Sequence, residues 1–181
     1  MREQSLTAAA TAVSSSRESF AVRAASADDI PLLAHHRAAM FRDMGKLAPH
    51  QEEALRGATA SYLRGALDTG EYLGWVALAT GTTSIIGGAG AQIRSIFPRP
   101  RHGSDDLELG PEAIVVNVYV EPAWRRRGVA DALMQAVLEG LATRGIRRIV
   151  LHASDEGRRL YERLGFVATN EMRLGPSRPR E

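Results

Sequence analysis

A run of apolar residues at 113–120 (AIVVNVYV) is the feature that most constrains the fold of this 181-residue chain. The run lacks the strict polar–apolar alternation of a strand with one face in water, so it predicts a strand buried on both faces. A helix is predicted soon afterwards, at 128–142, because apolar residues recur at every fourth position from Val129 to Leu141. A strand covered on both faces needs helices on either side of its sheet, which indicates an α/β fold.

Hydrophobic period and turn residues predict the remaining elements. Further strands are expected at 20–24, 72–79, 85–97, 147–152 and 166–174, and further helices at 30–44, 51–67 and 156–164. The apolar stripe of the first of these helices is expected at Leu33, Met40, Phe41 and Met44. This order of elements predicts a central mixed β-sheet flanked by helices.

Segments without a hydrophobic period complete the expected organisation. Residues 98–110 combine prolines, glycines and charges, so we expect a long loop there. Residues 1–19 are small and polar and are expected to form a disordered tail. A single domain is predicted at 20–175, followed by a C-terminal tail at 176–181.

Composition excludes several classes of protein. The chain has no cysteine, which rules out a disulfide framework, a thiolate metal site and a cysteine nucleophile. No apolar run approaches the ~18 residues of a membrane span, and the N-terminal stretch lacks the apolar core of a secretory signal, so we expect a cytoplasmic protein. The net charge is only +2, although the isoelectric point is about 9.4. Such a weak field does not indicate a nucleic-acid partner.

The basic residues matter through their positions. The 23 basic residues include one lysine, Lys46, and three arginines lie together at 125–127, between the apolar run and the helix at 128–142. Free N–H groups at a helix N-terminus favour phosphate, and Gly128 and Ala130 would let a ligand approach the backbone closely. The turn therefore predicts a pyrophosphate cradle, with a solvated surface turn as the alternative.

Two other phosphate-binding motifs are absent. The turn lacks the G-x-G-x-x-G pattern of dinucleotide-binding folds, and no glycine-rich loop ends in a lysine as a P-loop does. The glycines at 87–90 lie within a predicted strand and precede no helix, so we expect a bulge or a site of close approach there. His102, Asp105 and Asp106 share one loop, but nothing else supplies convergent metal ligands, so a solvated loop is expected.

The segment Arg125-Arg126-Arg127-Gly128-Val129-Ala130 resembles the R/Q-x-x-G-x-G/A signature of the GNAT superfamily of acyl-CoA-dependent N-acyltransferases. The segment 160–166 (LYERLGF) is similar to the L-Y-x-x-x-G-F signature of the same family. The two segments stand in the order found in the family, with a predicted strand between them. The stretch 35–45 also resembles a subgroup of small bacterial members.

The resemblance implies a set of acetyl-CoA contacts and a proton donor. The backbone of the family's fourth strand binds the pantetheine arm, which falls on Val118, Tyr119 and Val120. The amides of the signature turn would wrap the pyrophosphate, and the residues concerned are Arg125, Arg126, Arg127, Gly128, Val129 and Ala130. Tyr161 matches the tyrosine that protonates the departing CoA thiolate, a role that suits a positioned O–H donor. A strand amide would stabilise the oxyanion of the tetrahedral intermediate.

The sequence departs from the family at several positions. Ile114 stands where members often carry a glutamate that deprotonates the amine through water. Glu112 is a candidate replacement for this base, and Asn117 could orient a water molecule. Ser154 replaces an asparagine near the CoA arm and can still donate a hydrogen bond. His35 and His36 are further candidates for the base, because the unperturbed pKa of histidine is near 6.5.

We therefore expect an N-acetyltransferase that moves the acetyl group of acetyl-CoA to a primary amine, without a metal. The acceptor is expected to be a small molecule, bound between the first two helices, the loop after Phe97 and the central strand, with His36 and Phe41 in contact with it. We expect a monomer or homodimer with no nucleic-acid or membrane partner. A non-catalytic acyl-CoA-binding regulatory module and a protein N-acetyltransferase remain alternatives.

Overall fold

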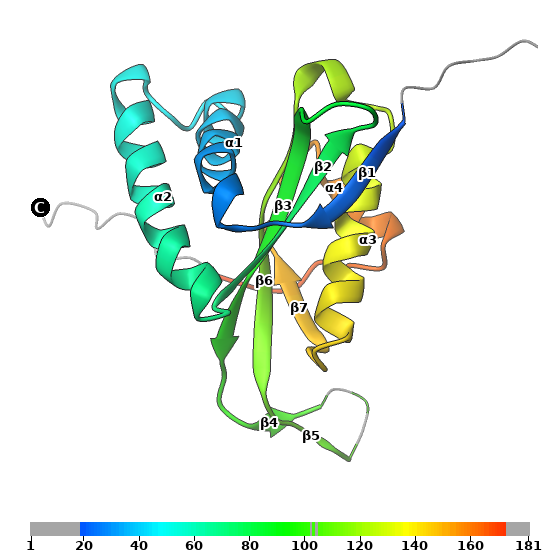
Figure 1. Cartoon of the computed structure of the whole chain (residues 1–181). Coiled ribbons are helices and arrows are strands. Elements are labelled where there is room, and N and C mark those ends of the chain that lie inside the picture. The colour runs from blue at the N-terminus through cyan, green and yellow to red at the C-terminus, as the bar shows by residue number, and fades with distance from the viewer. Residues whose placement is uncertain (1–18, 102, 104, 173–181) are drawn as a thin grey trace, which may run out of the picture.

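A five-stranded sheet in the order β1-β2-β3-β6-β7 forms the centre of the computed structural model, which describes residues 19–172 apart from 102 and 104 (Figure 1). Its strands are β1 (Phe20–Ala24), β2 (Tyr72–Ala79), β3 (Ile85–Ser95), β6 (Pro111–Val120) and β7 (Arg148–Leu151). The α-helices are α1 (Ile30–Asp43), α2 (Glu52–Asp68), α3 (Val129–Ala142) and α4 (Arg158–Arg163). Short 3-10 turns lie at Ala27–Asp29, Pro49–Gln51 and Pro122–Trp124. Among the strands described in this sheet, β6 and β7 pair in parallel and the other neighbours are antiparallel, so the expected mixed α/β sheet is confirmed.

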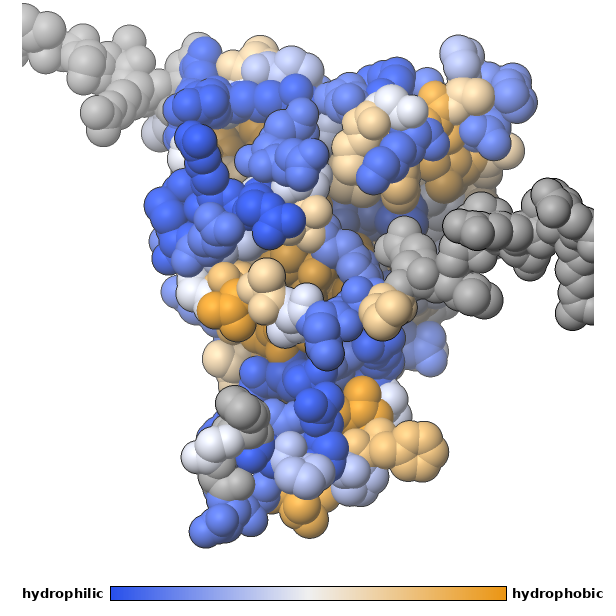
Figure 2. All heavy atoms as spheres, turned by 180° about the vertical axis from the view of Figure 1, so that it is seen from behind, coloured by the Kyte–Doolittle hydropathy of each residue, from blue (hydrophilic) through white to orange (hydrophobic). Residues whose placement is uncertain are grey.

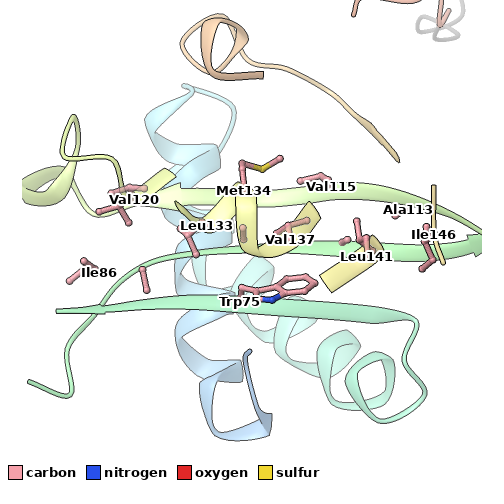
Figure 3. Packing of buried hydrophobic residues seen from close by; sticks show 14 of the residues in the cluster. Trp75, Ile86, Ala113, Val115, Val120, Leu133, Met134, Val137, Leu141 and Ile146 are labelled. Carbon is pink, nitrogen blue, oxygen red and sulfur yellow. The ribbon is translucent and has the colours of Figure 1, made fainter. Parts of the chain in front are cut away.

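Helices cover both faces of this sheet, with α1 and α2 on one side and α3 on the other (Figure 1). Side chains of β2 alternate between the two layers, as a strand period of two requires. Tyr72 and Val76 pack with Leu33 of α1, whereas Trp75 belongs to the cluster that contains Val137 and Leu141 of α3 (Figure 3). Burial of each large apolar side chain contributes about 1.5–3 kcal/mol, so these two clusters hold the helices on the sheet.

The glycines of β3 lie at a bulge and at sites of close approach, as predicted. The register with β6 shifts between Gly88 and Gly90, and a Cβ on Gly90 would lie 2.0 Å from Oη of Tyr72. Opposite the shift, Asn117 of β6 adopts a left-handed backbone with φ of 59°. The missing side chains in β3 thus give room to the Tyr72 ring, which lies under α1 and α2.

Replacement of Gly90 by Ala should lower the free energy of unfolding by about 1–3 kcal/mol, because the new methyl group overlaps the buried Tyr72 phenol. Gly57→Ala is the matched control. Nothing lies within 4 Å of the Cβ that it would add to α2, so it should stabilise the protein by about 0.5–1 kcal/mol. Urea unfolding of both variants measures the difference, and equal stabilities would contradict the packing described for Gly90.

Two predicted elements differ from the structure. The strand expected at 166–174 is wrong for its described part, because residues 166–172 form no strand and Val167 and Met172 are 82% and 93% exposed. Apolar residues that pair with no neighbouring strand do not form a sheet. The loop expected at 98–110 contains a short hairpin of β4 (Arg99–Pro100) and β5 (Leu107–Glu108), and the preceding strand ends at Ser95.

The buried side of α1 also differs from the predicted stripe. Leu33 is buried as expected, but Met40, Phe41 and Met44 are only half-buried. The buried positions after Leu33 are mainly small, namely Ala34, Ala38 and Ala39, together with His36. Small side chains let α1 lie close to the sheet, and a search for large apolar residues overlooks them.

The surface of the described chain is mostly polar. Figure 2 shows hydrophilic side chains over much of the face seen from behind, with smaller apolar areas between them. Among the described residues, no helix has the length and apolar character that crossing a membrane requires.

Candidate active site

Strand β6 is partly unpaired next to its bulge. Its parallel pairing with β7 covers residues 112–115 and ends where Val115 faces Leu151. Its pairing with β3 omits Asn117 and Val118. Backbone groups at 116–120 therefore have no β7 partner on that edge, and an edge of this kind can accept an extended ligand as an added strand.

The turn between β6 and α3 has two left-handed residues. Arg126 has φ of 63° and Gly128 has φ of 84°, a backbone that costs least at glycine. The first helical bond runs from the Ala132 N–H to the Gly128 carbonyl at 3.0 Å, so the preceding amides of α3 have no helical acceptor. These N–H groups carry the partial positive charge that favours an anion.

The three arginines of this turn have different contacts. Arg125 forms an ion pair with Asp43 at the end of α1, and its Nε donates to the Val120 carbonyl at 3.0 Å. The guanidinium of Arg127 lies 5.2 Å from the centre of the Trp124 ring. Arg126 is exposed and makes no hydrogen bond or ion pair with the described part of the chain. Arg125 thus braces the turn against α1, which the sequence does not reveal.

Tyr161 lies on α4 in a half-buried setting. A Cβ on Gly157 would lie 2.8 Å from the ring of Tyr161, and the ring of Phe166 meets it edge-on with centroids 6.1 Å apart. Burial raises the pKa of the Tyr161 phenol above its usual value near 10. The hydroxyl therefore stays protonated at neutral pH, as a proton donor must. Ser154 lies in the loop before α4, and its hydroxyl accepts a hydrogen bond from the Gly157 N–H at 3.2 Å.

A pocket of about 310 Å³ lies between α1, α2 and the sheet. Its lining comes from both helices and from β2, β3 and β6, and comprises Arg37, Leu55, Ala58, Thr59, Tyr62, Leu63, Tyr72, Gln92, Val116 and Asn117. The expected position between the first two helices and the central strand agrees with this pocket. The segment after Phe97 does not line it and contributes to a different pocket.

Polar side chains from α1, α2 and the sheet gather at this pocket. Arg37 donates from Nη1 to Oδ1 of Asn117, so the left-handed residue of β6 is tied to α1. Oη of Tyr72 is buried and finds no hydrogen-bond partner among the described residues. Burial raises the pKa of Tyr72 to about 12; the nearby Asn117 side chain offsets part of that effect, although the two groups do not complete a hydrogen bond. Across the pocket, Gln92 donates to the Tyr62 hydroxyl at 2.9 Å.

Neither residue expected to contact the acceptor lines this pocket. His36 is 1% exposed and packs against the Tyr119 ring with centroids 5.1 Å apart. Burial lowers the pKa of His36 to about 4, and its Nε2 lies 3.3 Å from Glu121 without hydrogen-bond geometry. Phe41 lies under the guanidinium of Arg37, 5.0 Å from the ring centre. Both residues support α1 from outside the pocket.

Glu112 also has a different setting from that of a general base. Its carboxylate is buried, and its two oxygens accept from Arg94 and Arg148. It lines a second pocket of about 340 Å³, beside Phe97 and Arg99, and does not line the first. A carboxylate whose two oxygens both bind guanidinium groups is not free to take a proton from an amine in the first pocket.

The remaining sequence candidates can also be placed. Trp75 is buried in the core and Trp124 is half-buried under Arg127, so the expectation that both serve packing is confirmed. No group of three or more metal-ligating side chains occurs among the described residues. His102 lies outside the described residues.

Comparisons with known proteins agree with this geometry. The acetyltransferase (GNAT) family model matches residues 32–166. A GCN5-related N-acetyltransferase from Ralstonia eutropha JMP134 is 33% identical, with a TM-score of 0.75 over 87% of this chain and 99% of that one. A predicted acetyltransferase from Clostridium acetobutylicum, solved with acetyl-CoA, is 26% identical, with a TM-score of 0.71 over 87% of this chain and 96% of that one.

A curated relative has a narrower match. The glucosamine 6-phosphate N-acetyltransferase of Trypanosoma brucei brucei is 30% identical over 94 residues, which are 51% of this chain and 58% of the relative. This chain thus matches little more than half the length of that enzyme. Because the family model covers the sequence from α1 to the residues after α4, the chain belongs to the acetyltransferase (GNAT) family.

Proposed function

We propose that this protein transfers the acetyl group of acetyl-CoA to a primary amine of a small molecule. The observation that carries the proposal is the course of β6, which connects two features. Val116 and Asn117, within the strand, line the pocket between the helices. The C-terminal end of the strand, at Val120, leads into the turn with free amides. One strand thereby joins an acceptor pocket to a cradle for an anion.

Acetyl-CoA fits the unpaired edge of β6 and the turn that follows it. Backbone groups of Val118, Tyr119 and Val120 would hold the pantetheine arm along the edge that β7 leaves open. The pyrophosphate would lie on the amides at 126–130, in the turn where Arg126 and Gly128 have a left-handed backbone. Arg126 adds an exposed positive charge, and Arg125 keeps the turn in place through Asp43. Ser154 is a weaker candidate, because its hydroxyl already holds the Gly157 amide.

The reaction needs an attack, an oxyanion site and a proton donor. The neutral amine attacks the thioester carbonyl, the new C–N bond forms, and the carbonyl oxygen takes up negative charge. A β6 amide beside the bulge can stabilise that charge. When the C–S bond breaks, the sulfur takes a proton from the Tyr161 hydroxyl. The amine loses its proton to water held near Asn117, and a proton from solvent restores the Tyr161 hydroxyl. We assign no proton transfer to Glu112.

Calorimetric titration with acetyl-CoA tests the binding half of this proposal. Gly128→Ala should weaken binding by up to about tenfold, because a side chain at φ of 84° strains the turn by roughly 1–2 kcal/mol. Gly70→Ala is the matched control, since Gly70 has φ of 73° at the end of α2 and open space around its Cβ. It should lose similar stability and keep its affinity. No heat of binding at millimolar acetyl-CoA for the folded protein would refute the proposal.

A further inference from the structure

The acceptor pocket carries one positive charge and no negative charge among its described lining residues. Arg37 supplies that charge, and the other lining groups are apolar, hydroxyl or amide side chains. Among the described residues, Arg37 forms no ion pair with a carboxylate; it donates to Asn117 and lies over Phe41. Burial lowers the pKa of Arg37, against smaller opposing effects of Tyr72 and Tyr62. A guanidinium remains charged in such a place, and a half-buried charge without a counter-ion is costly.

A second observation points to the same kind of ligand. Tyr72 lines this pocket, and its buried hydroxyl has no hydrogen-bond partner among the described residues. Buried hydroxyls are rarely left unpaired, so its O–H is available to an acceptor oxygen inside the pocket. Because burial raises its pKa to about 12, the phenol remains a neutral donor and adds no negative charge.

We propose that the acceptor is a compact amine that also carries a carboxylate or phosphate group, and that this anion binds Arg37 and Tyr72. The inference rests on the proposed function and adds the substrate class. Arg37 offers a planar set of donors for two anionic oxygens, and Asn117 holds it in position on the sheet side. The volume of about 310 Å³ suits an amino acid or a monosaccharide phosphate.

The same charge arrangement disfavours other amines. A polyamine or aminoglycoside brings several positive charges, and no lining carboxylate among the described residues would balance them. Repulsion by Arg37 also lowers the pKa of a bound ammonium group, which favours the neutral amine that attacks the thioester.

The test compares matched acceptors in assays of CoA thiol release. One pair is an amino acid and its amide, and the other is an amino sugar phosphate and the free amino sugar. The first member of each pair carries the anion. Spermidine represents the polycations. We expect kcat/KM to be higher by about tenfold or more for the anionic member of at least one pair. The amino acid pair and the sugar pair separate a carboxylate from a phosphate. Equal rates within both pairs, or a preference for spermidine, would overturn the inference and leave the proposed function standing.

Variants of Arg37 identify the group responsible. Arg37→Gln should lower the ratio of kcat/KM between the anionic acceptor and its neutral partner by about tenfold or more, and Arg37→Lys should lie between. Arg56→Gln is the control, because Arg56 lies on α2 outside the pocket and pairs with Glu53. Binding can also be measured without turnover. The amino acid or amino sugar phosphate that is the better acceptor should raise the melting temperature of the wild type but not of Arg37→Gln. The same discrimination in wild type and Arg37→Gln would overturn the assignment. Absence of thiol release with every amine would instead count against the proposed function.

Discussion

Replacement of Tyr161 by Phe is expected to lower kcat by about 10²- to 10⁴-fold, because the departing CoA thiolate then lacks its positioned proton donor. The ring contacts with Gly157 and Phe166 remain, since only the hydroxyl is removed. Affinity for acetyl-CoA should stay within a few-fold of the wild-type value. Initial rates of thiol release and a calorimetric titration measure the two quantities on the same preparation.

Phe166→Leu provides the control for this experiment. It removes the edge-on ring contact and keeps the Tyr161 hydroxyl, so the rate should fall far less than in Tyr161→Phe. If both variants lose the same activity, packing of α4 accounts for the effect and Tyr161 is not the acid. A wild type that binds acetyl-CoA and acetylates no amine would support a regulatory acyl-CoA-binding module.

The stability of the fold should decrease as the pH falls from 6.5 towards 4, and His36 is the expected cause. Its pKa is about 4 in the folded chain and 6.5 in the unfolded reference, so the unfolded state binds the proton over this range. A difference of this size corresponds to about 3 kcal/mol of folding free energy, present above pH 6.5 and lost by pH 4. Urea unfolding at a series of pH values between these limits measures the loss.

His36→Gln should remove most of this pH dependence, because the side chain that titrates is gone. His35→Gln, at the neighbouring and more exposed position, should retain it. Asp29 does not interfere, since Arg23 holds the pKa of Asp29 below its usual 3.8 and the corresponding loss of stability occurs at lower pH. A stability that is constant from pH 6.5 to 4 would mean that Glu121, 3.3 Å away, pairs with a protonated His36.

Patterns of neighbouring residues predicted those elements whose structure depends on residues close in sequence. The apolar run at 113–120, the fourfold spacing in α3 and the arginine turn all depend on residues close in sequence, and each lies where it was expected. The prediction of a strand at 166–174 was wrong for the described residues, because a hydrophobic period in the sequence does not show whether a partner strand is available. The alanine-rich buried side of α1 was missed because propensity searches weight large apolar residues.

The pocket between α1, α2 and the sheet could not be predicted at the level of individual residues. Arg37 and Asn117 are 80 positions apart and meet because α1 packs against β6, where Asn117 has a left-handed backbone. Tyr72 was assigned only to a strand, since nothing in its local sequence indicates a buried, unpaired hydroxyl. Glu112 was a candidate base because its carboxylate lies near the family's base position in the sequence. In the structure, Arg94 and Arg148, from two other strands, donate hydrogen bonds to this carboxylate. Contacts of this kind depend on tertiary structure and leave no local pattern.

The most direct test of acetyl transfer is a single reaction in which free CoA thiol and acetylated product are counted together. The protein, acetyl-CoA and an anionic amine of the preferred class should give one thiol for each N-acetylated acceptor found by mass spectrometry. Omission of either the protein or the amine should abolish both signals. A folded protein that releases no thiol above the blank with any member of the amine panel would contradict the assignment of acetyltransferase activity.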